Sequence, residues 1–377
     1  MTPSVSAPGL YVHIPFCLSK CAYCDFYSET ALNRIDDYLA ALRNEMALYS
    51  GRFGVFDTIY IGGGTPSVLS LDTFDEIFDG IADNFTIAAS AEITVETNPG
   101  DVTELLCRKL QDQGVTRITI GIQSFDDNVL SFLGRRHNAR EGRQALAAAR
   151  KAGFRSVCVD LIFGVPGQSR QSWLEILSEI VSYVPDHLSC YQLTIEPGTP
   201  LEARLRRGDF EPVDDDMVTT LFFDTSSFLQ QQGYEHYEVS NFARGDGHRS
   251  RHNQKYWRHA PYLGLGPSAH SFQGRSRWSN HGSLQDYCRA CMTGRCPVSD
   301  RETLTSEQYC LEAFALGLRT SDGIDCDAVT ELCGPAFIEG KRSVINALIK
   351  EGLLVMDGHR LRPTVRGLAV ADSLAVM

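Results

Sequence analysis

Short apolar runs alternate with longer amphipathic stretches over the first two thirds of the chain. Six runs rich in β-branched and aromatic residues predict strands, at residues 10–14, 57–61, 92–96, 117–122, 156–162 and 187–193. Apolar residues at helical spacing between them predict helices, at residues 35–49, 71–83, 102–113, 140–152 and 171–183. Repeated strand–helix units with apolar strands are typical of a parallel sheet covered by helices. Six units fit a partial (β/α)6 barrel better than a closed eightfold barrel, although an open sheet is the other solution.

The pattern changes after residue 213. A helical stretch at 214–232 precedes a region, 234–283, that holds six of the ten histidines. Three further helical patterns, at 306–318, 325–333 and 337–351, lead into a hairpin that turns at Asp357-Gly358. We therefore expect an α/β barrel at 1–240, a connecting region at 241–300 and an α+β winged-helix-like domain at 301–377.

Composition and charge narrow the class of protein. With 377 residues, of which 43% are hydrophobic, the chain can bury a large core and a smaller one. A formal net charge of -12 argues against nucleic acid as a partner, so we expect the winged-helix-like domain to pack on the barrel rather than on DNA. The sequence shows neither a secretory signal nor a membrane-spanning apolar run, and we expect a cytoplasmic protein. In that reducing compartment, the twelve cysteines are expected to be mostly buried thiols, and any tight cluster indicates metal rather than disulfides.

One tight cluster follows the first predicted strand. Cys17, Cys21 and Cys24 are spaced Cys-x3-Cys-x2-Cys, and three thiolates in so short a loop can hold one [4Fe-4S] cluster. Ferredoxin patterns supply a fourth cysteine, but Phe26 stands where a nearby one would be. One iron would therefore stay open to a substrate, as the open position of a catalytic zinc does. A zinc site completed by His13 is the alternative.

With Tyr23 before its last cysteine, this loop resembles that of the radical S-adenosylmethionine (SAM) superfamily. The resemblance implies that the amino and carboxylate groups of SAM chelate the open iron. One electron from the cluster would then break a carbon–sulfur bond and give methionine and a 5'-deoxyadenosyl radical. In such sites the cofactor carries the chemistry, while the protein supplies position and dryness.

Residues at the ends of the next predicted strands fit the same family. The run Gly62-Gly63-Gly64-Thr65-Pro66 matches its glycine motif, which contacts the methionyl amino group, although alone it indicates only a turn. Carboxylates suit ribose hydroxyls and an arginine suits the methionyl carboxylate, at the end of the barrel where such sites lie. Taken singly, each residue would be a helix cap or surface ion pair. The predicted SAM-binding residues are Tyr11, Tyr23, Gly63, Gly64, Thr65, Glu96, Gln123, Arg135 and Asp160.

The resemblance covers nearly the whole chain and narrows to the coproporphyrinogen-oxidase-like group. Oxidases of this group carry another cysteine two residues after the third and a long N-terminal extension, whereas this chain has Phe26 and ten residues before Tyr11. It instead carries His252-Asn253-Gln254-Lys255-Tyr256-Trp257, which matches the His-Asn-x-x-Tyr-Trp pattern of the haem chaperones in the group. Histidine is the commonest proximal haem ligand and aromatic rings pack on porphyrins, so we expect His252 to contact haem. Without the resemblance, a hydrogen-bonded structural histidine is the more usual reading.

The resemblance thus implies a chaperone that binds haem and transfers it to acceptor haemoproteins, with SAM cleavage that is slow or gates transfer. Oxygen-independent coproporphyrinogen III oxidase is the main alternative, and a haem-opening radical methyltransferase is a third. We expect a low-potential electron donor, allow for peripheral membrane association and for a monomer or a homodimer, and assign no catalytic residue. A second compact set of thiols, Cys288, Cys291 and Cys296, fits either metal binding or helix packing.

Overall fold

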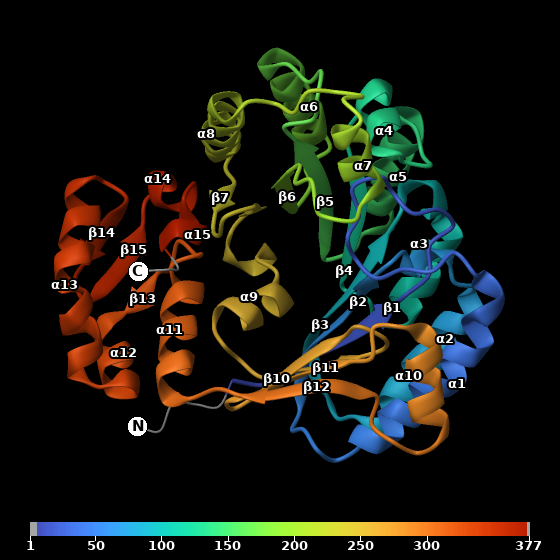
Figure 1. The fold of residues 1–377 in the computed structure, drawn as a ribbon. Helices are drawn as coiled ribbons and strands as arrows, with labels where there is room; N and C mark the ends of the chain where they lie inside the picture. Colours follow the sequence, from blue (N-terminus) through green and yellow to red (C-terminus); the bar gives the residue numbers. More distant parts are fainter. Residues whose placement is uncertain (1–5, 375–377) are drawn as a thin grey trace.

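The computed structural model describes residues 6–374. Its centre is a run of six parallel strands that are neighbours in chain order (Figure 1). They are β1 (Gly9–Ile14), β2 (Phe56–Gly63), β3 (Ile87–Thr97), β4 (Arg117–Gln123), β5 (Ser156–Phe163) and β6 (His187–Gln192). The main helices between them are α1 (Ile35–Tyr49), α2 (Leu71–Asn84), α3 (Glu104–Asp112), α5 (Ala139–Ala152) and α6 (Arg170–Ser182). The predicted strands and helices, and the partial (β/α)6 barrel, are confirmed.

Local signals in the sequence fix the ends of these helices. Ser70 caps α2 by accepting a hydrogen bond from the Thr73 backbone N–H, and Asn138 and Glu141 form a capping box at the start of α5. Gly153 ends α5 with φ of 85°, a left-handed conformation that glycine adopts without strain. Short helices α4 (Asp127–Leu133) and α7 (Pro200–Arg206) lie in the loops at the carboxyl ends of the strands. The barrel therefore presents capped helices outside and strand-end loops at one rim.

The connecting region extends the barrel sheet to twelve strands. On one side, β9 (Tyr262–Leu265) pairs parallel with β1 and is followed by antiparallel β10 (His270–Gln273), β11 (Ser276–Asn280) and β12 (Val298–Thr303). On the other side, β8 (Asn241–Ala243) and β7 (Glu235–His236) follow β6. Helices α8 (Asp215–Gln231), α9 (Arg251–Trp257) and α10 (Leu284–Met292) complete this part. The division of the chain at residues 240 and 300 stays a prediction.

A buried carboxyl group joins the extension to the barrel. Glu45 of α1 is 0% exposed and accepts hydrogen bonds from the Gly266 backbone N–H at 2.8 Å, Asn280 Nδ2 at 2.6 Å and the Tyr287 hydroxyl at 2.7 Å. Burial raises the pKa of Glu45 to about 7, against the effect of these donors. Because three partners on different elements converge on one side chain, α1, β11 and α10 are held in one arrangement.

The C-terminal domain lies beside the barrel and has a core of its own, which includes Phe314, Leu318, Ile345 and Leu361 (Figure 1). It consists of α11 (Ser306–Gly317), β13 (Ile324–Asp325), α12 (Cys326–Cys333), α13 (Pro335–Lys350), β14 (Leu354–Asp357), β15 (Arg360–Pro363), α14 (Val365–Leu368) and α15 (Ala371–Leu374). The three strands form a separate sheet in the order β13-β15-β14. The predicted winged-helix-like order is confirmed.

The C-terminal domain docks on the barrel through backbone hydrogen bonds and ion pairs, and Arg249 is the least exposed arginine among these pairs. The Val239 N–H donates to the Arg319 carbonyl at 3.2 Å, and the Ser321 N–H donates to the Tyr237 carbonyl at 2.9 Å. Arg249, whose side chain is 11% exposed, pairs with Asp322 at 3.0 Å and with Glu235.

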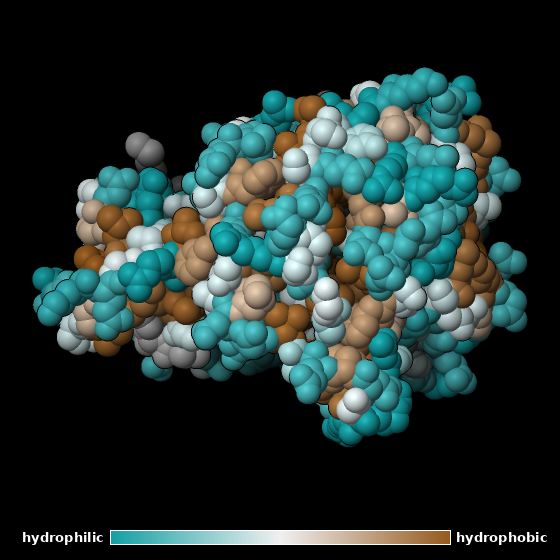
Figure 2. All heavy atoms as spheres, turned by 90° about the horizontal axis from the view of Figure 1, so that it is seen from above, coloured by the Kyte–Doolittle hydropathy of each residue, from teal (hydrophilic) through white to brown (hydrophobic). Residues whose placement is uncertain are grey.

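The outer surface of the molecule shows no single hydrophobic face in the view from above: hydrophobic residues lie there in separate patches among hydrophilic ones (Figure 2). No described helix is long and apolar enough to cross a membrane.

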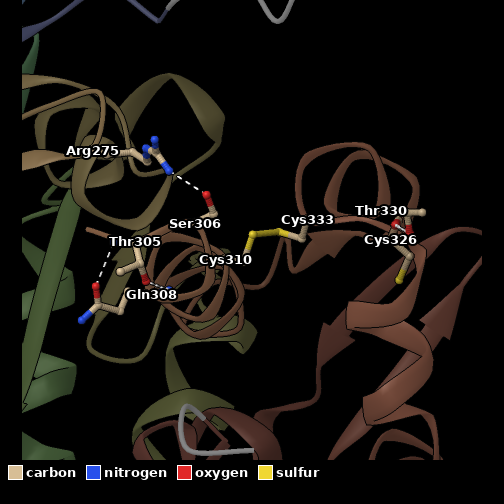
Figure 3. Close-up of a disulfide and its surroundings, with 8 residues drawn as sticks. All are labelled: Arg275, Thr305, Ser306, Gln308, Cys310, Cys326, Thr330 and Cys333. Atoms are coloured by element: carbon tan, nitrogen blue, oxygen red, sulfur yellow. Dashed lines mark hydrogen bonds between the residues drawn. A yellow bond between two sulfur atoms is a disulfide. The ribbon is translucent and has the colours of Figure 1, made fainter. Parts of the chain in front are cut away.

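The cysteines differ in one respect from the expectation. Most are buried or half-buried thiols, but Cys310 of α11 and Cys333 of α12 form a disulfide (Figure 3). The sequence predicts mostly buried thiols, and this pair is the exception, because the consecutive helices α11 and α12 bring the two Cα atoms to 5.8 Å. In the second thiol set, Cys291 is 1% exposed, and Cys288 Sγ lies 3.7 Å from the Asp37 carbonyl, so both pack against α1. Among residues 6–374, no three His, Cys, Asp or Glu side chains are placed to hold a single metal ion.

Candidate cluster and cofactor site

The loop that carries Cys17, Cys21 and Cys24 joins β1 to α1 at the carboxyl end of the parallel strands. The Cys17 N–H donates to the Glu29 carbonyl at 2.9 Å, which closes the base of the loop. Its tip is held by Ala22, whose N–H donates to the Leu133 carbonyl at 3.2 Å and whose carbonyl accepts from the Leu201 N–H at 2.8 Å. The loop is therefore fixed to α4 and α7, and the thiols lie at the rim of the barrel.

Polar groups lie against two of the three thiols. Thr65 Oγ1 is 3.3 Å from Cys17 Sγ, and Arg135 Nη1 donates to Cys21 Sγ at 3.2 Å. Burial raises the pKa of the Cys24 thiol, and its cysteine neighbours raise it further. Cysteine sulfurs are the usual ligands of iron–sulfur clusters, and three of them on one short loop form a donor set that suits a three-cysteine cluster. Phe26, which is 70% exposed, occupies the position of a fourth cysteine and lines the adjacent cavity.

A cavity of about 710 Å³ lies next to the cysteine loop, within the usual size range of small-molecule sites. Eight of the nine predicted SAM-binding residues line it: Tyr23, Gly63, Gly64, Thr65, Glu96, Gln123, Arg135 and Asp160. They meet because the carboxyl ends of parallel strands point to the same side of the sheet. The structure thus brings together residues that lie more than a hundred positions apart in the chain.

Two carboxyl groups in this cavity have raised pKa values. Glu96 accepts hydrogen bonds from the Tyr60 hydroxyl at 2.6 Å and the Gly63 N–H at 3.1 Å, and burial raises its pKa to about 7. Burial likewise raises the pKa of Asp160 to about 6, although Ser189 and two arginines oppose it. Desolvation is the cause in both cases. Each group can therefore exist with or without its proton near neutral pH, and as a carboxylate can accept from ribose hydroxyls.

Gln123 and Arg135 leave polar atoms unsatisfied beside the cavity. Gln123 has a φ of 63°, unusual for a residue other than glycine, and its buried Oε1 has no hydrogen-bond partner among the described residues. Arg135 Nη2 donates to the Gly121 carbonyl at 2.9 Å, while its Nε is unpaired within the described chain. A buried polar atom without a partner costs about 1–3 kcal/mol. The cavity therefore suits a polar ligand, which fits SAM.

Close packing against the cysteine loop is a second reason for glycine in the run 62–64, besides the approach of a ligand. A Cβ at Gly64 would lie 2.7 Å from the Phe16 carbonyl oxygen and 2.9 Å from that of Ile14. The Gly64 N–H donates to the Ile14 carbonyl at 2.8 Å. The end of β2 is thus packed directly on the chain that enters the cysteine loop, and a side chain at residue 64 would push that loop away.

Tyr11 and His252 lie outside this cavity. The Tyr11 hydroxyl is 2.9 Å from His13 Nδ1 in the interior of the barrel. His252 is 1% exposed, and both its ring nitrogens are occupied, with Nδ1 2.9 Å from Thr58 Oγ1 and Nε2 2.9 Å from the Tyr256 hydroxyl. Burial lowers the pKa of His252 to about 3. Neither ring nitrogen of His252 is free in this arrangement, so its expected contact with haem stays a prediction that would require one of these hydrogen bonds to break.

Several residues that line the cavity were not predicted. Asn98 and Tyr191 follow or end barrel strands, so their strand-end position could have found them. Arg319 and Asp372 come from the C-terminal domain and pair with each other at the rim. No local pattern marks them, because their place depends on how the C-terminal domain docks.

Comparisons with known proteins agree with this architecture. The model of the radical SAM superfamily matches residues 11–180, and that of the HemN C-terminal domain matches residues 304–370. The chain is 38% identical to the heme chaperone HemW of Escherichia coli, over 97% of this chain and 96% of that protein. It is 34% identical to the heme chaperone HemW of Mycobacterium tuberculosis, over 97% and 93%. The solved structure of coproporphyrinogen III oxidase (HemN) from E. coli superposes with a TM-score of 0.86 at 24% identity, covering 100% of this chain and 91% of that one.

Proposed function

Because this chain belongs to the radical SAM superfamily and, within it, to the family of the HemW heme chaperones, we propose that it binds haem and passes it to acceptor haemoproteins. The observation that carries the proposal is the similarity to these chaperones along nearly the entire length of both chains. The similarity to the oxidase is one of fold alone. Oxygen-independent coproporphyrinogen III oxidase, the alternative, therefore has less support.

The superfamily implies a [4Fe-4S] cluster and SAM. We assign the cluster to Cys17, Cys21 and Cys24, and SAM to the 710 Å³ cavity beside them. When bound, the pair supplies reductive cleavage of a carbon–sulfur bond. The chain's own groups hold the ligand: Glu96 and Asp160 accept from hydroxyls, and Arg135 places positive charge beside Cys21.

The haem side of the proposal rests on the family. Acceptor haemoproteins follow from the chaperone role. We further propose that a low-potential electron donor reduces the cluster and that the protein is cytoplasmic, with peripheral association with a membrane as an option. The proposal allows either a monomer or a homodimer. His252 as the iron ligand stays a prediction, and it requires that the ring leave Thr58 or Tyr256.

Anaerobic work on the reconstituted full chain tests this function. Haem is titrated while the Soret band is followed, and the loaded protein is then mixed with an apo-haemoprotein. We expect saturable binding and transfer, without decarboxylation of coproporphyrinogen III. Decarboxylation at enzyme-like rates would support the oxidase instead. Absence of saturable haem binding would remove the chaperone proposal.

A further inference from the structure

Two side chains from outside the cysteine loop reach its sulfur atoms. The Thr65 hydroxyl lies 3.3 Å from Cys17 Sγ, and Arg135 Nη1 donates a hydrogen bond to Cys21 Sγ at 3.2 Å. Backbone hydrogen bonds already hold the base and the tip of the loop. The two side chains are therefore free to act on the sulfurs rather than on the fold of the loop.

Local structure directs the Thr65 hydroxyl at its sulfur. Thr65 precedes a short 3-10 helix, η2 (Pro66–Val68), at the position where a threonine usually caps the helix. Within the described chain, its side chain makes no such cap. Its backbone N–H donates to the Phe16 carbonyl at 2.7 Å, which fixes the residue against the start of the cysteine loop. The hydroxyl that would cap η2 is thus turned to Cys17.

The end of α4 places the guanidinium of Arg135. Gly134 ends α4 in a left-handed conformation with φ of 71°, and a Cβ there would lie 3.3 Å from the Ala22 nitrogen at the tip of the cysteine loop. Glycine therefore lets the end of the helix pack closely on the loop. Arg135 Nη2 donates to the Gly121 carbonyl at 2.9 Å while Nη1 donates to Cys21. The side chain is held between β4 and the loop.

The third sulfur of the loop has a donor of a different kind. Burial raises the pKa of the Cys24 thiol, and a hydrogen bond from the Phe26 backbone N–H opposes that shift. A backbone amide stays whatever the side chain, whereas a hydroxyl and a guanidinium depend on the residue. The three sulfurs thus face an amide, a hydroxyl and a cation, and only the last two depend on the side chain present.

These contacts bear on the charge of a cluster held by the loop. Cysteine binds metal as the thiolate, which can only accept a hydrogen bond, so the Thr65 hydroxyl is then the donor. Hydrogen bonds to the sulfurs and nearby charge are among the factors that set the reduction potential of an iron–sulfur cluster. We propose that Thr65 and Arg135 set the reduction potential of the cluster, as positioning residues that act through Cys17 and Cys21. The inference rests on the proposed cluster site and adds how the chain tunes it.

The direction of the effect follows from charge. Reduction adds one electron, and donors at the sulfurs stabilise the more negative state, so they raise the potential. The guanidinium should contribute more than the hydroxyl, because hydrogen bonds from charged donors are the stronger ones. A cluster with a raised potential accepts an electron more readily and gives it up less readily. Slow cleavage of SAM would follow from such a cluster.

A redox titration of the reconstituted full chain tests the proposal, without SAM and with electron paramagnetic resonance of the reduced cluster as the signal. Thr65→Val should lower the equilibrium constant of reduction about tenfold, a shift of about 59 mV for one electron. Thr65→Ser, which restores the hydroxyl, should return the wild-type potential. Arg135→Gln should lower the potential further than Thr65→Val. Thr103→Val is the matched control, because the Thr103 hydroxyl caps α3, and it should keep the wild-type potential.

Iron and sulfide content is measured first for every variant. Thr65→Ala also lacks the hydroxyl and has a smaller side chain, so it decides the test if the branched side chain of Thr65→Val prevents assembly of the cluster. A wild-type potential in Thr65→Val, Thr65→Ala or Arg135→Gln would overturn the proposal, as would an equal shift in Thr65→Ser. A wild-type chain that assembles no [4Fe-4S] cluster would instead remove the cluster assignment, which separates the two failures.

Discussion

The two cavities of this chain are built in different ways. The cavity beside the cysteines is lined mainly by the ends of consecutive parallel strands, and a continuous buried core supports them. A second cavity, of about 460 Å³ beside His259, lies where α9, with the His-Asn-x-x-Tyr-Trp run in which we expect the haem contact, meets a domain with a core of its own. A few backbone bonds and ion pairs hold that contact. The first site therefore depends mainly on the barrel, with Arg319 and Asp372 of the C-terminal domain at its rim, and the second depends on docking, so most changes should affect one site more than the other.

Loss of one cluster ligand should have the largest effect. Cys21→Ser removes a thiolate that Arg135 supports, and we expect complete loss of the [4Fe-4S] cluster and of SAM binding, with haem binding kept. Iron and sulfide content, with equilibrium dialysis of SAM, measures this. Cys296→Ser is the matched control and should keep the cluster. A Cys21→Ser protein with a full cluster would show that the triad is not the ligand set.

Loosening the contact between the C-terminal domain and the barrel should have the next largest effect. Here we expect haem binding to weaken while SAM binding is kept, the reverse of the result for Cys21→Ser. Arg249→Ala leaves Glu235 without its ion-pair partner and Asp322 with Arg258 alone. Because both carboxylates are 41% exposed, we expect a cost of about 1 kcal/mol. We expect weaker haem binding and faster amide exchange in α11, with unchanged SAM affinity. Arg206→Ala, which breaks a pair whose arginine is 75% exposed, should change stability by less than about 0.5 kcal/mol. Equal losses of SAM and haem affinity in Arg249→Ala would refute separate support of the two cavities.

A change of pH should act on the SAM cavity. The pKa of Glu96 is about 7 in the folded chain, above its usual 4.5. If the carboxylate accepts from ribose hydroxyls, SAM affinity should rise with pH and level off above pH 7, by up to about tenfold between pH 6 and pH 8. The same raised pKa means that the stability contributed by protonated Glu96 is lost as pH rises through 7. Glu96→Gln should flatten the pH profile of SAM binding, and an unchanged slope would exclude Glu96.

Replacement of Arg319 should have the smallest effect on ligand binding. This residue contacts both regions, so its replacement tests the coupling between them. It lines the SAM cavity, and its guanidinium lies 5.1 Å from the centre of the Trp257 ring. A cation–π contact of this kind contributes about 0.5–2 kcal/mol. We expect SAM to change haem affinity a few-fold, and Arg319→Gln to reduce that coupling. Isothermal titration of haem with and without SAM measures it, and identical coupling in both proteins would place the connection elsewhere.

The two regions also differ in how well they could be predicted from the sequence. Strand periodicity and the Cys-x3-Cys-x2-Cys spacing are local, and chain-order pairing then fixes which strand ends meet. The resemblance to the radical SAM superfamily selected Glu96, Gln123 and Asp160 at those ends, and all three line the cavity. Arg319 and His259 could not be found in this way, because their surroundings are made by residues far away in the chain. His252 shows the limit of motif reading: the structure places it in a hydrogen-bonded position inside the barrel, while Trp257 of the same run lines the second cavity.

The most direct test of two separate sites is a haem titration of a variant that cannot form the cluster. The protein with Cys17→Ser, Cys21→Ser and Cys24→Ser is titrated anaerobically beside the wild type. Our account predicts the same Soret position and an affinity within a few-fold of the wild-type value, because neither His252 nor Trp257 of the His-Asn-x-x-Tyr-Trp run lines the cavity beside the cysteines. Loss of haem binding, or a Soret band at a different position, would contradict it.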